Sequence, residues 1–235
     1  MRIECNICGG TNLVAGGLRG LMVCQDCSAH PVTRILWLLL TESGLLRPGV
    51  RILHIAPERA FADRLRAVAG ENYDPVDIDP AGYAHVPGTR PFDLCADAAE
   101  LPSAFYDLVI HSHVMEHVKC NVTAVLWHLH RALRPGGLHL CCIPFTRDRY
   151  SSEDLAPLSQ EDAIARFGQN DHVRIFGARD VQDTVGRLFR LPGDYDLLRR
   201  FPAELLDRYA IPDVARAGWT PHSVLALAKD DLLLA

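Results

Sequence analysis

The sequence lacks any long uninterrupted apolar stretch. Its most apolar run, residues 35–40, is far shorter than the roughly 18 residues that a membrane-spanning helix needs. The first five residues also lack the charged and then apolar build of a secretory signal peptide. We therefore expect no membrane partner, and the sequence favours a cytoplasmic protein.

The sequence also lacks an excess of positive charge. Lys and Arg number 24 against 29 Asp and Glu, which gives a formal net charge of -5. Within residues 1–30, Arg2 and Arg19 are offset by Glu4 and Asp26, so this segment has no basic face. Proteins bind nucleic acid largely through such positive fields. A nucleic-acid partner is therefore disfavoured.

The eight cysteines favour metal ligation or burial over disulfides in a cytosolic chain. Two Cys-x-x-Cys pairs with fifteen residues between them are formed by Cys5, Cys8, Cys24 and Cys27. Two such turns can direct four sulfurs at one tetrahedral ion, and four thiolates leave no open position for catalysis. A redox motif would be expected once rather than twice at this spacing. We predict a structural zinc ribbon over residues 1–30.

Beyond residue 30, helical and extended patterns alternate. Helices are expected at residues 31–47, 61–69, 118–133 and 178–189. Strands are expected at residues 50–55, 72–78, 92–95, 106–111, 138–143 and 223–228. This order predicts an α/β fold with a doubly wound, mainly parallel sheet over residues 31–235, in which the last strand is antiparallel at the edge. The polar residues 144–180 are expected to form a flap over the sheet.

Acidic residues follow two of the expected strands. Doubly wound sheets bind ligands at the carboxyl ends of their strands. Asp77 could accept hydrogen bonds from both hydroxyls of a ribose there, with Asp79 as the nearby alternative. Asp97 follows the next strand and could accept from an adenine amino group. Each residue alone is more often a solvated or capping residue, but their order and intervals together favour a nucleoside ligand.

Several segments resemble the class I methyltransferases over about residues 48–145. They are VDIDP at 76–80, DAAELP at 97–102, YDLVI at 106–110 leading into VMEHV at 114–118, and ALRPGG at 132–137. The resemblance implies a Rossmann-like methyltransferase fold and S-adenosylmethionine as methyl donor. By position it implies donor contacts from Asp77, Ile78, Asp97, Ala98, His111, Ser112 and His113.

The first loop, HIAPER at 54–59, departs from the family because it has no glycine. Pro57 also lacks a donor N–H. Either cofactor binding is weakened, or the loop takes another path in which His54 and Ala56 lie beside the cofactor and Glu58 holds its ammonium group. The cysteine pairs, RILW at 34–37, HIAPE at 54–58 and FGQNDHVR at 167–174 together resemble a bacterial subgroup with an N-terminal zinc ribbon. This narrower resemblance favours the second path.

Histidines supply the candidate catalytic residues. An imidazole titrates near neutrality, so His113 and His172 could contact the acceptor or act as general base. Methyl transfer can also proceed by alignment alone, without a base. A second metal site formed by His111, His113 and His172 would require the strand to continue past Ile110.

Two further residues are candidates for substrate binding. His117 is expected chiefly to cap or pack its helix, but it lies beside the methyl-transfer motifs. Arg174 could hold an acidic acceptor, and an ion pair with Asp171 or Asp180 is equally compatible with the sequence.

The sequence therefore predicts an S-adenosylmethionine-dependent methyltransferase that acts on an oxygen or nitrogen of a small molecule. One alternative is a methyltransferase for RNA or protein that uses the ribbon as a docking module. Another is a non-catalytic scaffold whose first loop has lost the cofactor. No oligomeric state is predicted.

Overall fold

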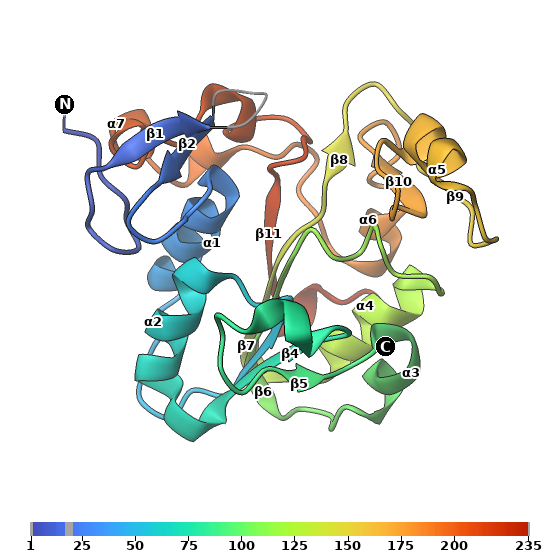
Figure 1. Cartoon of the computed structure of the whole chain (residues 1–235), viewed down its shortest axis with the longest axis horizontal. Helices are drawn as coiled ribbons and strands as arrows, with labels where there is room; N and C mark the ends of the chain where they lie inside the picture. The colour runs from blue at the N-terminus through green and yellow to red at the C-terminus, as the bar shows by residue number, and fades with distance from the viewer. Residues whose placement is uncertain (1, 17–20, 235) are drawn as a thin grey trace.

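A six-stranded sheet forms the centre of the molecule (Figure 1), in a computed structural model that describes residues 2–16 and 21–234. The strand order is β11-β7-β6-β3-β4-β5. The strands are β3 (Ile52–Ile55), β4 (Tyr73–Asp77), β5 (Arg90–Pro91), β6 (Tyr106–Ser112), β7 (Leu133–Cys142) and β11 (Val224–Ala228). All pairings are parallel except that of β11 with β7. The predicted doubly wound sheet with an antiparallel edge strand is confirmed.

The order of the strands reverses next to β3. This strand pairs with β4 on one side and with β6 on the other. The chain therefore leaves these strands toward different edges, and a crevice opens between the loops at their carboxyl ends. The candidate ligand-binding segments follow β3, β4 and β6 directly.

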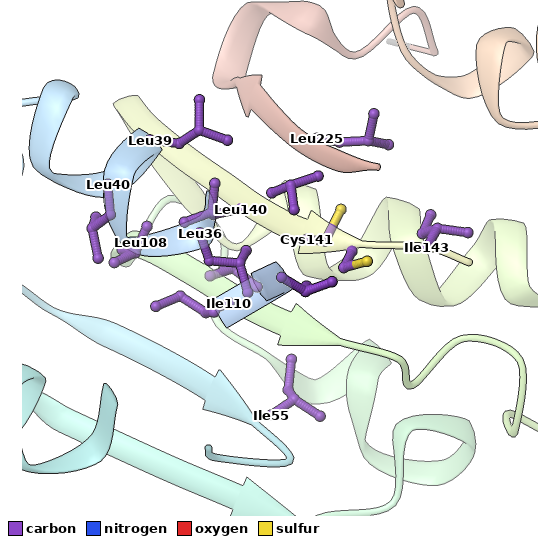
Figure 2. Close-up of a cluster of buried hydrophobic side chains, with 14 of the residues drawn as sticks. Leu36, Leu39, Leu40, Ile55, Leu108, Ile110, Leu140, Cys141, Ile143 and Leu225 are labelled. Atoms are coloured by element: carbon purple, nitrogen blue, oxygen red, sulfur yellow. The ribbon is translucent and has the colours of Figure 1, made fainter. Parts of the chain in front are cut away.

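Helices cover both faces of the sheet. Figure 1 shows α1 (Pro31–Glu42) and α2 (Arg59–Ala69) on the opposite side from α4 (Val122–Arg131). Neighbouring residues of a strand point to opposite faces, so β7 can contact both layers. Figure 2 shows the apolar packing around β7, with side chains from Leu36, Leu39, Leu40, Leu108, Ile110, Leu140 and Leu225. On the other face, the ring of His130 from α4 lies 5.8 Å from that of His139, centroid to centroid.

Several expected elements differ from the observed ones: α1 ends at Glu42 rather than at residue 47, and β7 begins at Leu133 rather than at residue 138. In three others, side chains cap or anchor the backbone. The strand expected at 92–95 is wrong: β5 ends at Pro91, and the Asp93 carboxylate accepts from the Cys95 N–H to cap α3 (Leu94–Asp97). The helix expected from 118 begins only at Val122, where Asn121 caps it. The helix expected at 178–189 is reduced to α6 (Val185–Leu188), because Asp180 binds the Ser151 N–H in the flap.

The flap expected at 144–180 has its own small sheet. Its elements are β8 (Phe145–Thr146), β9 (Ser152–Glu153), α5 (Gln160–Phe167) and β10 (Arg174–Gly177). The central strand β10 pairs parallel with β8 and antiparallel with β9. This sheet gives the flap internal hydrogen bonding rather than an irregular path.

The first thirty residues contain an antiparallel hairpin of β1 (Leu13–Gly16) and β2 (Leu21–Cys24). Arg19, whose charge entered the sequence argument, lies outside the described residues. The hairpin region joins the main core, since Cys5, Ile7 and Cys24 belong to the same buried cluster as the sheet. Among the described residues, no helix has the length and apolarity to cross a membrane.

A buried arginine joins this N-terminal region to the C-terminal part of the chain. Arg34 of α1 is fully buried and donates to the carbonyls of Ala29 at 2.7 Å and Met22 at 2.8 Å. Its guanidinium also donates to Tyr209 at 2.8 Å, just beyond α7 (Ala203–Arg208). One side chain therefore satisfies backbone acceptors from three separate segments.

Replacing Arg34 should destabilise the protein strongly. Arg34→Met would leave several buried carbonyls without donors, and each unsatisfied group costs about 1–3 kcal/mol. We expect the free energy of unfolding in urea, measured with zinc present, to fall by about 3 kcal/mol. The matched control Arg64→Met removes an exposed arginine of α2 and should change it by less than about 0.5 kcal/mol. Equal effects of the two substitutions would contradict this account.

Candidate functional site

Two neighbouring cavities open at the carboxyl ends of β3, β4 and β6. The large cavity has a volume of about 640 Å³, and the small cavity about 330 Å³. His113, which follows β6 directly, lines both cavities. The large cavity is also lined by Ile55, Ala56, Asp77, Ile78, Tyr83, Phe92, Asp93, Leu94, Cys95, Val114, His117, Val118, Lys119 and Asp171.

Asp77 lines the large cavity from the end of β4. One of its oxygens accepts from the Asp79 N–H at 2.8 Å, which fixes the loop beyond the strand. Burial, followed by the charge of Asp77 and a hydrogen bond with it, raises the pKa of Tyr83 to about 12. The side chain of Ile78 also lines the cavity, and this residue is 71% exposed. A carboxylate acceptor and an uncovered apolar surface thus lie side by side.

Asp93, rather than the predicted Asp97, lines the large cavity beyond β5. The Asp97 carboxylate turns back and accepts from the Asp93 N–H at 2.7 Å. Ala98 is buried and lines neither cavity. The sequence analysis missed Asp93 and Leu94 because it continued the strand through them. Asp is a residue type that favours the N-cap position of a helix. Asp93 is therefore the sequence signal that could have indicated a helix start, and its bond from the Cys95 N–H shows that it caps α3.

The first loop adopts a glycine-like conformation without a glycine. Ala56 has a φ of 51°, in the left-handed region that costs an L-residue about 1–2 kcal/mol. Its N–H donates to the Val76 carbonyl at 2.9 Å, and the residue lines the large cavity. His113 has a similar φ of 52°. Strained backbone on both sides of the crevice is typical of ligand-binding sites.

His54 lies in the core rather than in the site. Its Nδ1 is 2.9 Å from the Tyr73 hydroxyl, and burial lowers the pKa of the imidazole to about 3. It lines neither cavity. The predicted contact between His54 and the cofactor therefore has no direct route, because the side chain points into the packing between the sheet and α2.

The small cavity lies between the N-terminus of α1 and the strand tips. Its wall includes residues 30–33, Glu58 and Ser112. Leu21 and Ser28, from the N-terminal region that also contains His30, line it as well. The first turn of a helix leaves N–H groups without helical acceptors. Burial raises the pKa of Glu58 to about 7, and its Oε2 has no hydrogen-bond partner among the described residues. The cavity thus offers both an anion-binding helix end and a carboxylate.

His113 pairs with a carboxylate between the two cavities. Its Nδ1 lies 3.4 Å from Oε1 of the buried Glu116, and its Nε2 lies 3.6 Å from the Cys142 sulfur. Burial alone lowers the pKa of His113, but Cys142 and Glu116 raise it above the ordinary value of 6.5. A protonated imidazole donates rather than accepts. The contact with Glu116 supports a positioning role for His113, and its role as general base stays a prediction.

His111 points to the opposite face of the sheet. Strand β6 does continue past Ile110, and alternation would place His111 and His113 on the same face, but the strand ends at Ser112 and His113 already has left-handed backbone. The His111 ring lies 5.0 Å from that of His139, and burial lowers its pKa to about 4. His111 therefore lines neither cavity, and the metal site of His111, His113 and His172 does not form.

The flap brings two predicted residues near the large cavity in different ways. The His172 ring lies 4.6 Å from that of His117, centroid to centroid. Arg174 is not free for substrate, because its buried guanidinium donates to the carbonyls of Met115 and Cys120 and contacts Glu153 at 3.2 Å. The candidate partners Asp171 and Asp180 bind His117 and Ser151 instead. Arg174 anchors the flap to the turn between β6 and α4.

The four N-terminal cysteine sulfurs converge on one point. All lie within 4.8 Å of one another, with Cys5 and Cys27 at 3.7 Å and Cys8 and Cys24 at 3.6 Å. A disulfide would need about 2.05 Å. Four sulfurs at about 2.3 Å from a tetrahedral ion lie about 3.8 Å apart. The residues present therefore fit a zinc ion.

Comparison with known proteins agrees with the fold. The sequence model of a family described as "Methyltransferase domain" matches residues 40–187 of the 235-residue chain. No curated protein was found that matches it. A mainly parallel, doubly wound sheet of this order is a Rossmann-like fold. The family match covers more than half of the chain, so the protein belongs to the methyltransferase-domain family.

Solved structures with a similar fold share little sequence identity with this chain. An S-adenosylmethionine-dependent methyltransferase from Mesorhizobium loti is 21% identical over 52% of this chain and 54% of its own, with a TM-score of 0.37. A putative sarcosine dimethylglycine methyltransferase from Galdieria sulphuraria is 17% identical over 64% and 57%, with a TM-score of 0.39. A methyltransferase from Archaeoglobus fulgidus is 15% identical over 84% and 93%, with a TM-score of 0.47. The chain spans little more than half the length of the first two.

Proposed function

We propose that this methyltransferase binds S-adenosylmethionine across both cavities and methylates an oxygen or nitrogen of a small molecule. The observation that carries the proposal is the position of His113, where the two cavities meet. One cavity is suited to an adenosyl group and the other to an amino acid. The reactive sulfur would then lie beside His113.

The large cavity supports the adenosyl end of this proposal. The Asp77 carboxylate can accept from both ribose hydroxyls, as the sequence suggested. The exposed Ile78 can cover one face of the adenine, and Asp93 with Leu94 lies where Asp97 and Ala98 were expected to contact its edge. The left-handed backbone at Ala56 lets this loop approach the ligand despite its missing glycines.

The small cavity supports the amino-acid end. The N-terminus of α1 at Val32 and Thr33 suits a carboxylate, because its free N–H groups and the helix dipole favour negative charge. Glu58 is suited to the ammonium group, as the sequence analysis expected. Ser112 lies in the same wall and can contribute a hydroxyl. Opposite charges at the two sides of one cavity would orient a zwitterion.

When bound, S-adenosylmethionine supplies a methyl group already activated on a sulfonium, so alignment of the acceptor is the main requirement. Glu116 holds His113 in place beside the meeting point of the cavities. The flap carries His172 next to His117, which lines the large cavity. Burial lowers the pKa of His172, so its imidazole is neutral and can accept a proton or a cation. A large cavity of about 640 Å³ leaves room for a small acceptor beside the cofactor.

We further propose that the four cysteines hold a structural zinc ion. The ribbon then contributes Leu21, Ser28 and His30 to the wall of the small cavity. In this proposal zinc acts on the reaction only by keeping that wall in place. It has no open coordination position.

Asp77→Asn should weaken cofactor binding selectively. Loss of a charged acceptor for two ribose hydroxyls is expected to raise the Kd for S-adenosylhomocysteine by about 10- to 100-fold, measured by calorimetry. The matched control Asp79→Asn alters an exposed carboxylate two residues away and should change the Kd less than about threefold. Absence of any binding by the folded, zinc-loaded protein would instead favour the non-catalytic scaffold.

Cofactor affinity should increase with pH between 6 and 8. Because burial raises the pKa of Glu58 to about 7, its carboxyl is mostly protonated at the lower pH and cannot attract an ammonium group. Calorimetry should find S-adenosylhomocysteine bound about tenfold more tightly at pH 8 than at pH 6. Glu58→Gln should bind weakly at both values. A variant that keeps the full pH dependence would rule out this role.

Zinc should be present at one ion per chain before any other metal is added. Metal analysis of the purified protein measures this directly, and strong chelation should expose four thiols to a thiol reagent. Cys8→Ser with Cys27→Ser should abolish the zinc. Cys95→Ser, which removes an exposed cysteine far from the ribbon, should retain it. A zinc-free protein with four protected thiols would exclude the ribbon site.

A further inference from the structure

A second set of metal-ligating side chains lies at the wall of the large cavity. Glu116, His117 and His172 each offer a ligand atom, and these atoms lie within 4.8 Å of one another. Glu116 and His117 occupy the turn between β6 and α4, whereas His172 comes from the flap. The Val173 N–H donates to the Glu116 carbonyl at 3.0 Å, which fixes the flap beside this turn.

Each of the three side chains has one polar atom engaged and another left over. Glu116 directs Oε1 toward His113 at 3.4 Å, and its buried Oε2 has no partner among the described residues. His117 directs Nδ1 toward Asp171 at 3.2 Å. His172 hydrogen-bonds the Phe167 carbonyl, and since its buried Nε2 has no partner, the ring donates through Nδ1.

This is the arrangement in which proteins hold metal ions. A ligating histidine usually donates its other ring N–H to a carboxylate or a backbone carbonyl, which fixes the tautomer and the direction of the lone pair. Here the carboxylate of Asp171 is the partner of His117, and the carbonyl of Phe167 is the partner of His172. Buried polar atoms without partners are uncommon in folded proteins. Glu116 Oε2 and His172 Nε2 both lack a partner among the described residues, and one shared cation would satisfy both.

We propose that Glu116 Oε2, His117 Nε2 and His172 Nε2 bind one divalent ion of the first transition row. Two imidazoles and one carboxylate suit such ions better than they suit Ca²⁺ or Mg²⁺, which prefer oxygen ligands. Ligands at about 2.1 Å from one ion lie about 3 to 4.2 Å apart. Small side-chain rotations therefore close the set around the ion.

Three protein ligands leave coordination positions open, and His117 and Asp171 line the large cavity. This consequence rests on the proposed methyl transfer. The ion would bind the oxygen of a hydroxyl acceptor and lower its pKa, so that its proton passes to solvent. The oxygen then forms a bond to the methyl carbon while the carbon–sulfur bond breaks, which converts the sulfonium to a neutral thioether. The acceptor would therefore be a hydroxyl compound rather than an amine.

The metal site is tested without cofactor or acceptor. The full chain, with its ribbon loaded with zinc, is titrated with Mn²⁺, and bound ion is followed by the loss of the free Mn²⁺ electron paramagnetic resonance signal. We expect one Mn²⁺ per chain in addition to zinc. His117→Gln and His172→Gln should weaken binding by about 10-fold or more. The control His85→Gln changes an exposed histidine and should leave binding unchanged.

Glu116 needs a second measurement because it is buried. Glu116→Gln keeps the volume of the side chain. The zinc content and thermal unfolding of this variant report whether it folds. Its affinity for Mn²⁺ should fall by as much as that of His172→Gln. Binding that survives in both histidine variants would place the ion elsewhere, for example at the enclosed set His111, His139 and Cys141, and would overturn the proposal. No binding of either Mn²⁺ or Co²⁺ would also overturn it.

The result is separable from that for the cofactor. Binding of S-adenosylhomocysteine with no Mn²⁺ site would sink this inference and leave the proposed function standing. A Mn²⁺ site in a chain that binds no S-adenosylhomocysteine would support the site and sink the proposed function.

Discussion

The reversal of chain order beside β3 is the constraint on which the rest of the structure depends. Because β4 and β6 leave this strand in opposite directions, the loops after all three strands must diverge and leave a crevice. Ala56 and His113, on either side of it, both adopt left-handed backbone that an L-residue enters only at a cost. The packed sheet and its two helical layers hold this strain. The crevice is therefore a direct consequence of the sheet order.

The N-terminal region is part of the site as well as of the core. Its four cysteines converge on one point, and its residues form one wall of the small cavity. Arg34 donates both to a carbonyl of this region and to a carbonyl in the C-terminal part of the chain, and so joins the two. A segment of thirty residues cannot bury enough apolar surface to hold such a wall alone. The buried guanidinium of Arg34 supplies part of that rigidity, and the proposed zinc ion would supply more. This explains how a structural zinc site could affect cofactor binding from outside the sheet.

The opposite side of the large cavity is held by the flap. Arg174 binds two carbonyls of the turn between β6 and α4, and the Val173 N–H binds a third. This attachment brings His172 next to His117 and Glu116. In the FGQNDHVR segment, Arg174 therefore anchors the flap, and its neighbour His172 lies beside His117.

The sequence by itself determined the parts of this protein whose cause is local. Hydrophobic periodicity fixed the order of helices and strands, the spacing of Cys5, Cys8, Cys24 and Cys27 indicated one four-sulfur site, and Asp77 was identified at a strand tip. Only the tertiary structure decided which face or cavity each polar residue reaches. His111 and His113 differ by two positions, yet one enters the core and the other the site, because the strand ends between them. Asp93 replaced Asp97 because a capping bond began a helix early, and Arg174 was occupied by carbonyls far away in sequence. Such long-range contacts leave no local pattern, since a side chain's partners depend on how distant segments pack.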